Sequence, residues 1–87
     1  MHWLRSWESF VRIVETGSMA AAARRLDCTR AQISKQVADL EREFGVRLFE
    51  RSTRKLALTP SGEVFYQHAL RALDAVASTE IAVRNLG

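Results

Sequence analysis

The sequence has few of the residues on which several classes of protein depend. Its 87 residues contain a single cysteine, Cys28, which excludes a disulfide within the chain and favours a reducing compartment. The two histidines, His2 and His68, lie far apart in the sequence, and neither is close to Cys28. Residues so few and so scattered do not predict a metal site or a cysteine–histidine nucleophile.

Long apolar runs and phosphate-binding loops are also missing. No segment approaches the roughly 20 apolar residues that span a membrane. Arg5, Glu8 and Arg12 interrupt the apolar N-terminal run that a signal peptide would need. The glycines are isolated and no pair of carboxylates is placed for acid–base work. We therefore expect a cytoplasmic protein that is not an enzyme and needs no cofactor or metal.

The composition is that of one small globular domain with a basic middle. Hydrophobic residues make up 47% of the chain and charged residues 26%. The net charge is only +3, which is mild for a nucleic-acid-binding protein. Between residues 24 and 55, however, nine Lys and Arg stand against five Asp and Glu, so the middle third holds the whole positive excess. Such clustering indicates an acidic partner.

Two helices are predicted before residue 27. Apolar residues at helical spacing indicate a first helix from Trp3 to Glu15, with both tryptophans packed in the core, and the residues that carry this pattern are Trp3, Trp7, Phe10, Val11 and Val14. Ser18 is then expected to cap a short second helix, from Met19 to Leu26. Its four alanines favour helix and have little bulk, so a neighbouring helix can pack closely against it.

The segment from Thr29 to Phe44 is predicted to be a third helix, around which the domain is organised. Thr29 and Gln32 form a potential capping box, and Gly45 follows as a C-terminal glycine. One face carries an apolar stripe at Ile33, Val37, Leu40 and Phe44. The opposite face combines small residues with cations, at Arg30, Ala31, Ser34, Lys35, Ala38 and Arg42. A face of this kind fits the major groove of DNA, although an ordinary amphipathic helix would carry a similar stripe.

The second and third helices, joined by a three-residue turn, form a helix-turn-helix pattern. Alternating apolar residues then predict a two-stranded β-hairpin, with strands over 46–51 and 56–58. Its tip carries side chains that can bond phosphate oxygens, at Arg51, Ser52, Thr53, Arg54 and Lys55. A chance charge cluster in a solvated turn would have the same composition.

Thr59 and Pro60 begin the last predicted helix, which continues to Leu86 without a breaking residue. At about 1.5 Å per residue it reaches roughly 40 Å, more than a small core can cover. Its later turns therefore predict a seam for another helix, with candidate residues Leu70, Leu73, Val76, Ala77 and Ile81. We predict a winged helix-turn-helix domain over residues 1–59 and a linker and dimerisation helix over 60–87.

These elements in this order resemble the N-terminal domain of LysR-type transcriptional regulators. The resemblance runs from about Trp3 to the end and rests on short motifs. The most specific are Leu40–Arg51, which reads LEREFGVRLFER, and Leu58–Gly62, which reads LTPSG. The resemblance implies bacterial regulators of about 300 residues that bind DNA as dimers or tetramers. It also implies that they are associated with the nucleoid in the cytoplasm. Their linker helices pair antiparallel, and a small-molecule effector binds a C-terminal domain that these 87 residues do not contain.

The resemblance also assigns contacts by position. Residues touching bases or nearby phosphates fall on Arg30, Ala31, Ser34 and Lys35, with Thr29 and Gln32 beside them. Arg54 corresponds to a wing arginine that enters the minor groove, and Ser18 is placed to meet a phosphate. Family members often have Gln-Pro where this chain has Arg30-Ala31. Arg30 can therefore read guanine or clamp a phosphate.

The sequence leaves one alternative from another functional class. A winged helix can serve as a protein-interaction module whose dimer seam is its main purpose. The small-residue face of the predicted third helix favours DNA instead, because a protein interface is enriched in aromatic residues.

Overall fold

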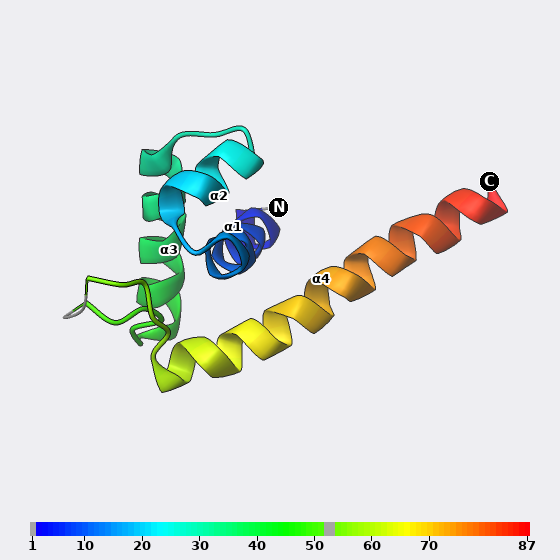
Figure 1. Ribbon diagram of the computed structural model, residues 1–87. Coiled ribbons are helices and arrows are strands. Elements are labelled where there is room, and N and C mark those ends of the chain that lie inside the picture. The colour runs from blue at the N-terminus through cyan, green and yellow to red at the C-terminus, as the bar shows by residue number, and fades with distance from the viewer. Residues whose placement is uncertain (1, 52–53) are drawn as a thin grey trace.

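The computed structural model describes residues 2–51 and 54–87. Four helices follow one another along the chain: α1 (His2–Thr16), α2 (Met19–Arg25), α3 (Arg30–Phe44) and α4 (Pro60–Leu86). Helix α1 packs against the other three and separates α3 from α4 (Figure 1). The helices predicted from sequence are confirmed to within one or two residues at their ends.

The core lies where α1, α2, α3 and the first turns of α4 meet. Its fully buried side chains include Phe10, Ile13, Ile33, Val37 and Leu40. Ala22 and Ala23 of α2 are also buried, which lets this short helix lie close to its neighbours. Cys28 packs against the edge of the same core, as a small apolar side chain.

Two aromatic residues depart from the predicted burial. Trp3 is 44% exposed and makes an edge contact with Trp7 at a ring distance of 5.7 Å, so the prediction that it lies in the core was wrong. Phe44, the last residue of the predicted stripe on α3, is 47% exposed. Both residues lie at a helix end, where the neighbouring helices no longer cover them.

The helix ends follow the predicted caps. Ser18 accepts a hydrogen bond from the Ala21 amide at 3.0 Å. Thr29 and Gln32 form the predicted capping box at the start of α3, through bonds of 3.1 and 2.8 Å. Gly45 ends α3 with a φ of +67°, a conformation that L side chains rarely adopt. These local signals place the two helices of the helix-turn-helix.

The two-stranded hairpin predicted after α3 is not confirmed, because the described residues of this segment form no strand. Within the described residues it contains one antiparallel bridge, between Phe49 and Leu58, and no longer strand pairing. Thr59 donates to the Leu48 carbonyl at 3.0 Å, but the Thr59 carbonyl accepts from Glu63 in the first turn of α4. The Leu48 amide also bonds elsewhere, so the ladder cannot continue past this pair.

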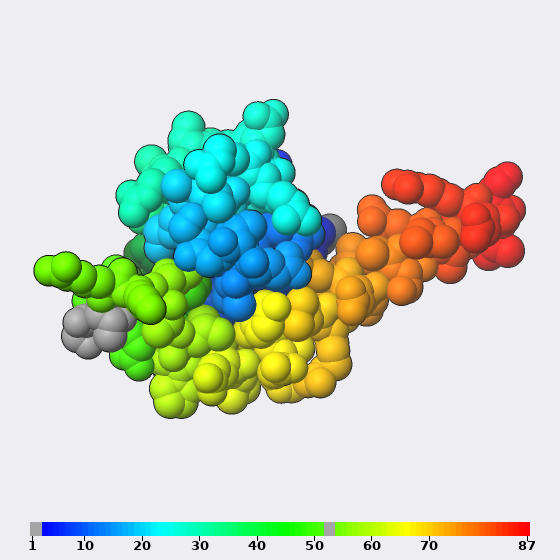
Figure 2. All heavy atoms as spheres, in the orientation of Figure 1, coloured from blue at the N-terminus to red at the C-terminus, as the bar shows by residue number. Residues whose placement is uncertain are grey.

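Helix α4 leaves the core and projects from it. Its C-terminal end lies on the opposite side of the molecule from the loop between α3 and α4 (Figures 1 and 2). The molecule is correspondingly elongated, with principal dimensions of 49 × 25 × 20 Å. Across the described residues, no helix combines the length and apolarity that a membrane span requires.

Candidate nucleic-acid interface

The outward face of α3 is open to solvent along its whole length. Arg30, Ala31, Ser34 and Lys35 are all exposed, and Ala38 and Arg42 continue the same face. The buried side of the helix faces the core, so the sequence pattern divides the helix as predicted. The result is a ridge with little side-chain bulk between positive charges.

An ion-pair network shapes the middle of this ridge. Asp39 accepts from Lys35 at 3.1 Å and also pairs with Arg42. The hydrogen bond from Lys35 lowers the pKa of Asp39 below its ordinary value, with the nearby charge of Arg42 adding to the effect. Asp39 is therefore ionised at neutral pH and offsets part of the positive charge of the ridge.

Thr29 and Gln32 have a different role from their neighbours. At the start of α3, the Thr29 hydroxyl accepts a hydrogen bond from the Gln32 amide, and the Gln32 side-chain oxygen accepts one from the Thr29 amide. These groups therefore hold the helix end in place. Arg30 and Ala31, in the first turn, project beside them and are exposed.

A surface hollow of about 320 Å³ brings together four of the predicted contact residues. Ser18, Arg30, Arg54 and Lys55 all line it, together with the acidic residue Glu50. The start of α2, the start of α3 and the loop thus converge on one cationic hollow. Residues distant in sequence are brought together here, as a site for an extended anion requires.

Among the predicted wing residues that the structure describes, Arg51 does not line this hollow. Thr53, with its neighbour Ser52, lies outside the described residues. Arg51 donates to the Glu41 carboxylate at 2.7 Å, on the side of the loop that faces the C-terminal half of α3. The sequence prediction did not single out Glu41. The available signal was an acidic residue in the last turn of a helix, where the helix dipole disfavours it.

The five predicted seam residues on α4 divide into two groups. Leu70 and Leu73 pack partly against the core of their own protomer, and Val76 is half-buried. Ala77 and Ile81 are exposed. Only the second half of α4 therefore presents an uncovered seam.

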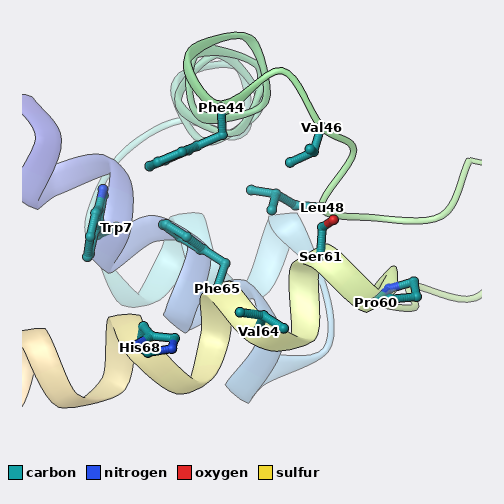
Figure 3. Close-up of a pocket in the computed structure, with 9 residues that line it drawn as sticks. All are labelled: Trp7, Phe44, Val46, Leu48, Pro60, Ser61, Val64, Phe65 and His68. Atoms are coloured by element: carbon teal, nitrogen blue, oxygen red, sulfur yellow. The ribbon is translucent and has the colours of Figure 1, made fainter.

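Another apolar surface lies beside the start of α4. A groove of about 620 Å³ is bounded by α1, the end of α3 and the first turns of α4 (Figure 3). Trp7 meets the Phe65 ring edge to face at a ring distance of 4.9 Å, and Phe44 meets it at a tilt at 5.5 Å. Val46 and Val64 also line the groove. Val64 is 61% exposed, so this part of the groove faces solvent.

Comparison with known proteins identifies this combination of elements. Residues 4–63 match the family model described as "Bacterial regulatory helix-turn-helix protein, lysR family". The chain belongs to the lysR family. The match covers the three helices, the loop and the first turn of α4, and the resemblance noted from the sequence is confirmed.

Curated lysR-type relatives extend the match. The probable regulator LtrA of Klebsiella pneumoniae is 48% identical over 66 residues, which are 76% of this chain and 21% of that protein. The activator AaeR of Escherichia coli is 42% identical over 76 residues, 87% of this chain and 25% of that protein. An uncharacterized regulator of Azotobacter vinelandii is 39% identical over 83 residues, or 95% of this chain, and the chain spans 58% of its length.

Solved structures of lysR-type domains have the same fold. The "BenM_DBD/catB site 1 DNA Complex" superposes with a TM-score of 0.90 at 35% identity, covering 95% of this chain and 92% of that one. The "CbnR_DBD-DNA complex" gives a TM-score of 0.85 at 36% identity, with 95% of each chain covered. The similarity includes most of α4, because nearly the whole chain is matched.

Proposed function

We propose that this chain is the sequence-specific DNA-binding domain of a bacterial transcriptional regulator. The observation that carries the proposal is the exposed ridge of α3, which has small residues between cations and lies next to the cationic hollow. A ridge of low bulk can enter a major groove about 12 Å wide. The structural neighbours that contain DNA support the proposal, because they share the arrangement of these elements.

The contacts divide into those that read bases and those that hold phosphates. Arg30, Ala31, Ser34 and Lys35 occupy the ridge and are our candidates for the base edges. Ser18 and Lys55 line the hollow beside it and are our candidates for phosphate oxygens. Arg54 also lines this hollow and is exposed, and it is our candidate for the neighbouring minor groove.

We propose a homodimer in which α4 pairs antiparallel with its copy. The groove-side face of α4 runs from Val64 through Ala75 to Leu86 at helical spacing. Val64 and Leu86 lie equally far in sequence from Ala75. If two antiparallel α4 helices cross at Ala75, Leu86 of each copy therefore lies beside Val64 and the groove of the other copy. Ala77 and Ile81 are exposed, but at about 100° per residue they lie roughly 200° and 240° around the helix from Ala75, so this pairing leaves them outside the seam.

This pairing gives the exposed apolar end of α4 a neighbour. Leu86 is 90% exposed in the protomer and Val83 is 63% exposed. In the dimer, the C-terminal end of α4 would contact Trp7, Phe44 and Val64, which line the groove of the other copy (Figure 3). The small side chain of Ala75 allows the two helices to approach closely where they cross. Two reading helices held this way would meet a pseudo-palindromic site.

The chain spans between 21% and 58% of the three curated relatives named above, so roles of a longer protein are inferred separately. We propose a cytoplasmic regulator of which this domain is the DNA-binding part. Effector binding and tetramer formation would belong to a further C-terminal domain.

The test is duplex binding measured at several salt concentrations, with a site obtained by selection from random sequences. We expect binding that weakens steeply with salt, because phosphate contacts release counterions. Arg54→Ala should weaken binding to all duplexes and reduce the salt slope by about 0.9. Arg30→Ala or Ser34→Ala should change the preferred sequence by about 1–3 kcal/mol per base pair.

The same titration decides against the protein-interaction alternative. Duplex binding that does not depend on salt, or no binding at all, would favour a module whose groove contacts only protein. Arg84→Ala in the last turn of α4 is a matched control, because it removes one exposed cation at the end of the helix that lies on the opposite side of the molecule from the loop (Figure 1). Its salt slope should equal that of the wild type.

A further inference from the structure

A buried carboxylate connects α3 to the loop that follows it. Glu41 is 8% exposed and is the one charged side chain that is buried among the described residues. Its Oε2 atom accepts from the Leu48 amide at 2.8 Å and from the Phe49 amide at 3.4 Å. Its Oε1 atom accepts from the Arg51 guanidinium at 2.7 Å. One side chain thus binds the loop at three points, Leu48, Phe49 and Arg51.

The backbone of the same residue holds the turn between these parts. The Glu41 carbonyl accepts from the amides of Gly45 and Val46. The helix end and the start of the loop are therefore fixed by one residue, through its main chain and its side chain. A charge buried in this way requires hydrogen-bond partners, since an unpaired buried carboxylate is strongly unfavourable.

Arg51 and Arg54 lie in different surroundings, although only three positions separate them in the sequence. Arg51 borders a hollow that it shares with Arg42, Arg47 and the Glu41 carboxylate. Arg54 borders the hollow that it shares with Ser18 and Arg30. The two guanidinium groups therefore face opposite ends of α3, and only one of them has a buried anion to neutralise.

We propose that Glu41 is a positioning residue that sets the orientation of the loop relative to α3, and that Arg51 is its counterion rather than a DNA contact. Glu41 thereby brings Arg54 and Lys55 beside the ridge. This inference rests on the proposed DNA binding. It removes Arg51 from the phosphate contacts that the sequence predicts.

The decisive variant is Glu41→Gln. Removing a negative charge near DNA should strengthen binding and steepen its salt dependence if charge alone matters. If Glu41 positions the loop, the variant should instead weaken binding. A neutral glutamine side chain has one acceptor oxygen, so it cannot accept hydrogen bonds from both the loop amides and the Arg51 guanidinium. We expect at least tenfold weaker duplex binding and a salt slope lower by about 1, although no cation has been removed.

Glu43→Gln is the matched control. Glu43 lies two positions further along α3, is exposed and carries the same charge. Its loss should leave duplex binding unchanged or make it slightly tighter. If Glu41→Gln binds duplexes as Glu43→Gln does, the positioning role is refuted. If the wild type itself shows no salt-dependent duplex binding, the proposed function fails instead.

Arg51→Met and Arg54→Met test the role of the counterion. Each variant removes one guanidinium, so their net charges are equal. Arg54→Met should lower the salt slope, whereas Arg51→Met should leave the slope unchanged and lower the thermal midpoint of the free protein. A fall of the slope in Arg51→Met equal to that in Arg54→Met would make Arg51 a phosphate contact and overturn the assignment.

A double variant tests the pair without DNA. Thermal unfolding of Glu41→Gln, Arg51→Met and their combination measures whether the two residues act together. We expect the double variant to be no less stable than Glu41→Gln alone, since the counterion has no function once the charge is gone. Additive losses would show that the two side chains stabilise the fold independently, against the proposed pairing.

Discussion

Asp39 is the residue that most directly limits the positive charge of the α3 ridge. It pairs with both Lys35 and Arg42, and the hydrogen bond from Lys35 keeps its pKa low. The carboxylate also orients these two long side chains along the helix. Restricting their freedom before binding reduces the entropy lost when they meet DNA.

Asp39→Asn should therefore tighten binding to duplexes of any sequence while it reduces discrimination between them. The variant removes one negative charge beside the phosphates and releases two cations for new contacts. We expect a salt slope steeper by about 1–2, in proportion to the phosphates neutralised. Titrations of the selected site and of an unrelated duplex measure both effects. Equal affinity and slope to the wild type would mean that Asp39 lies outside the interface.

Single residues were predictable from sequence where their roles are local. The capping box of Thr29 and Gln32 depends on spacing along one helix, and spacing is visible in the sequence. The role of Glu41 depends on a loop that folds back on it, so the sequence showed only a charge. The exposure of Trp3 likewise depends on where neighbouring helices end.

At the scale of elements, the junction between the loop and α4 depends on a close approach at Gly62. A Cβ atom at this position would lie 2.0 Å from the Leu48 carbonyl oxygen. The first turn of α4 therefore rests directly on the backbone of the loop. The sequence shows only a glycine in the first turn of a predicted helix, because close contact between two distant segments leaves no local pattern.

Gly62→Ala should lower stability, although the same change inside an ordinary helix raises it by up to about 1 kcal/mol. The new methyl group must displace either the loop or α4, at a cost of about 1–3 kcal/mol. Urea unfolding followed by circular dichroism measures the difference. Ser61→Ala provides the control, because Ser61 is exposed in the same turn. A stabilised Gly62→Ala variant would contradict this packing.

The segment between α3 and α4 shows a limit of predicting secondary structure from the pattern of apolar residues. Alternating apolar residues predicted strands over 46–51 and 56–58, and the described part of the structure shows one bridge between them, from Phe49 to Leu58. Thr59 caps α4, and Glu41 accepts the amides of the first segment. Helix capping and a buried carboxylate therefore take up the backbone groups beyond Leu48 and Thr59, so strand pairing does not extend in that direction and the predicted two-stranded hairpin is not confirmed.

At the scale of the whole molecule, α4 presents the exposed apolar residues that a second copy would cover. Leu86→Lys should weaken the dimer, because it places a charge in the groove of the partner. Sedimentation or light scattering should show a shift toward the monomer mass, and duplex affinity should fall with it. Arg84→Lys is the control, as it keeps the charge near the same helix end. An unchanged mass for Leu86→Lys would place the seam elsewhere on α4.

The tight seating of Gly62 also has a mechanical consequence. Since α4 is joined firmly to the loop and the loop to α3, the helix and the reading head turn as one body. A lever of about 40 Å that tilts by five degrees at its far end moves the head by roughly 3 Å. This displacement is close to the rise of one base pair. Small changes in the crossing angle of two paired α4 helices would thus shift the two α3 helices by about one base pair along the DNA.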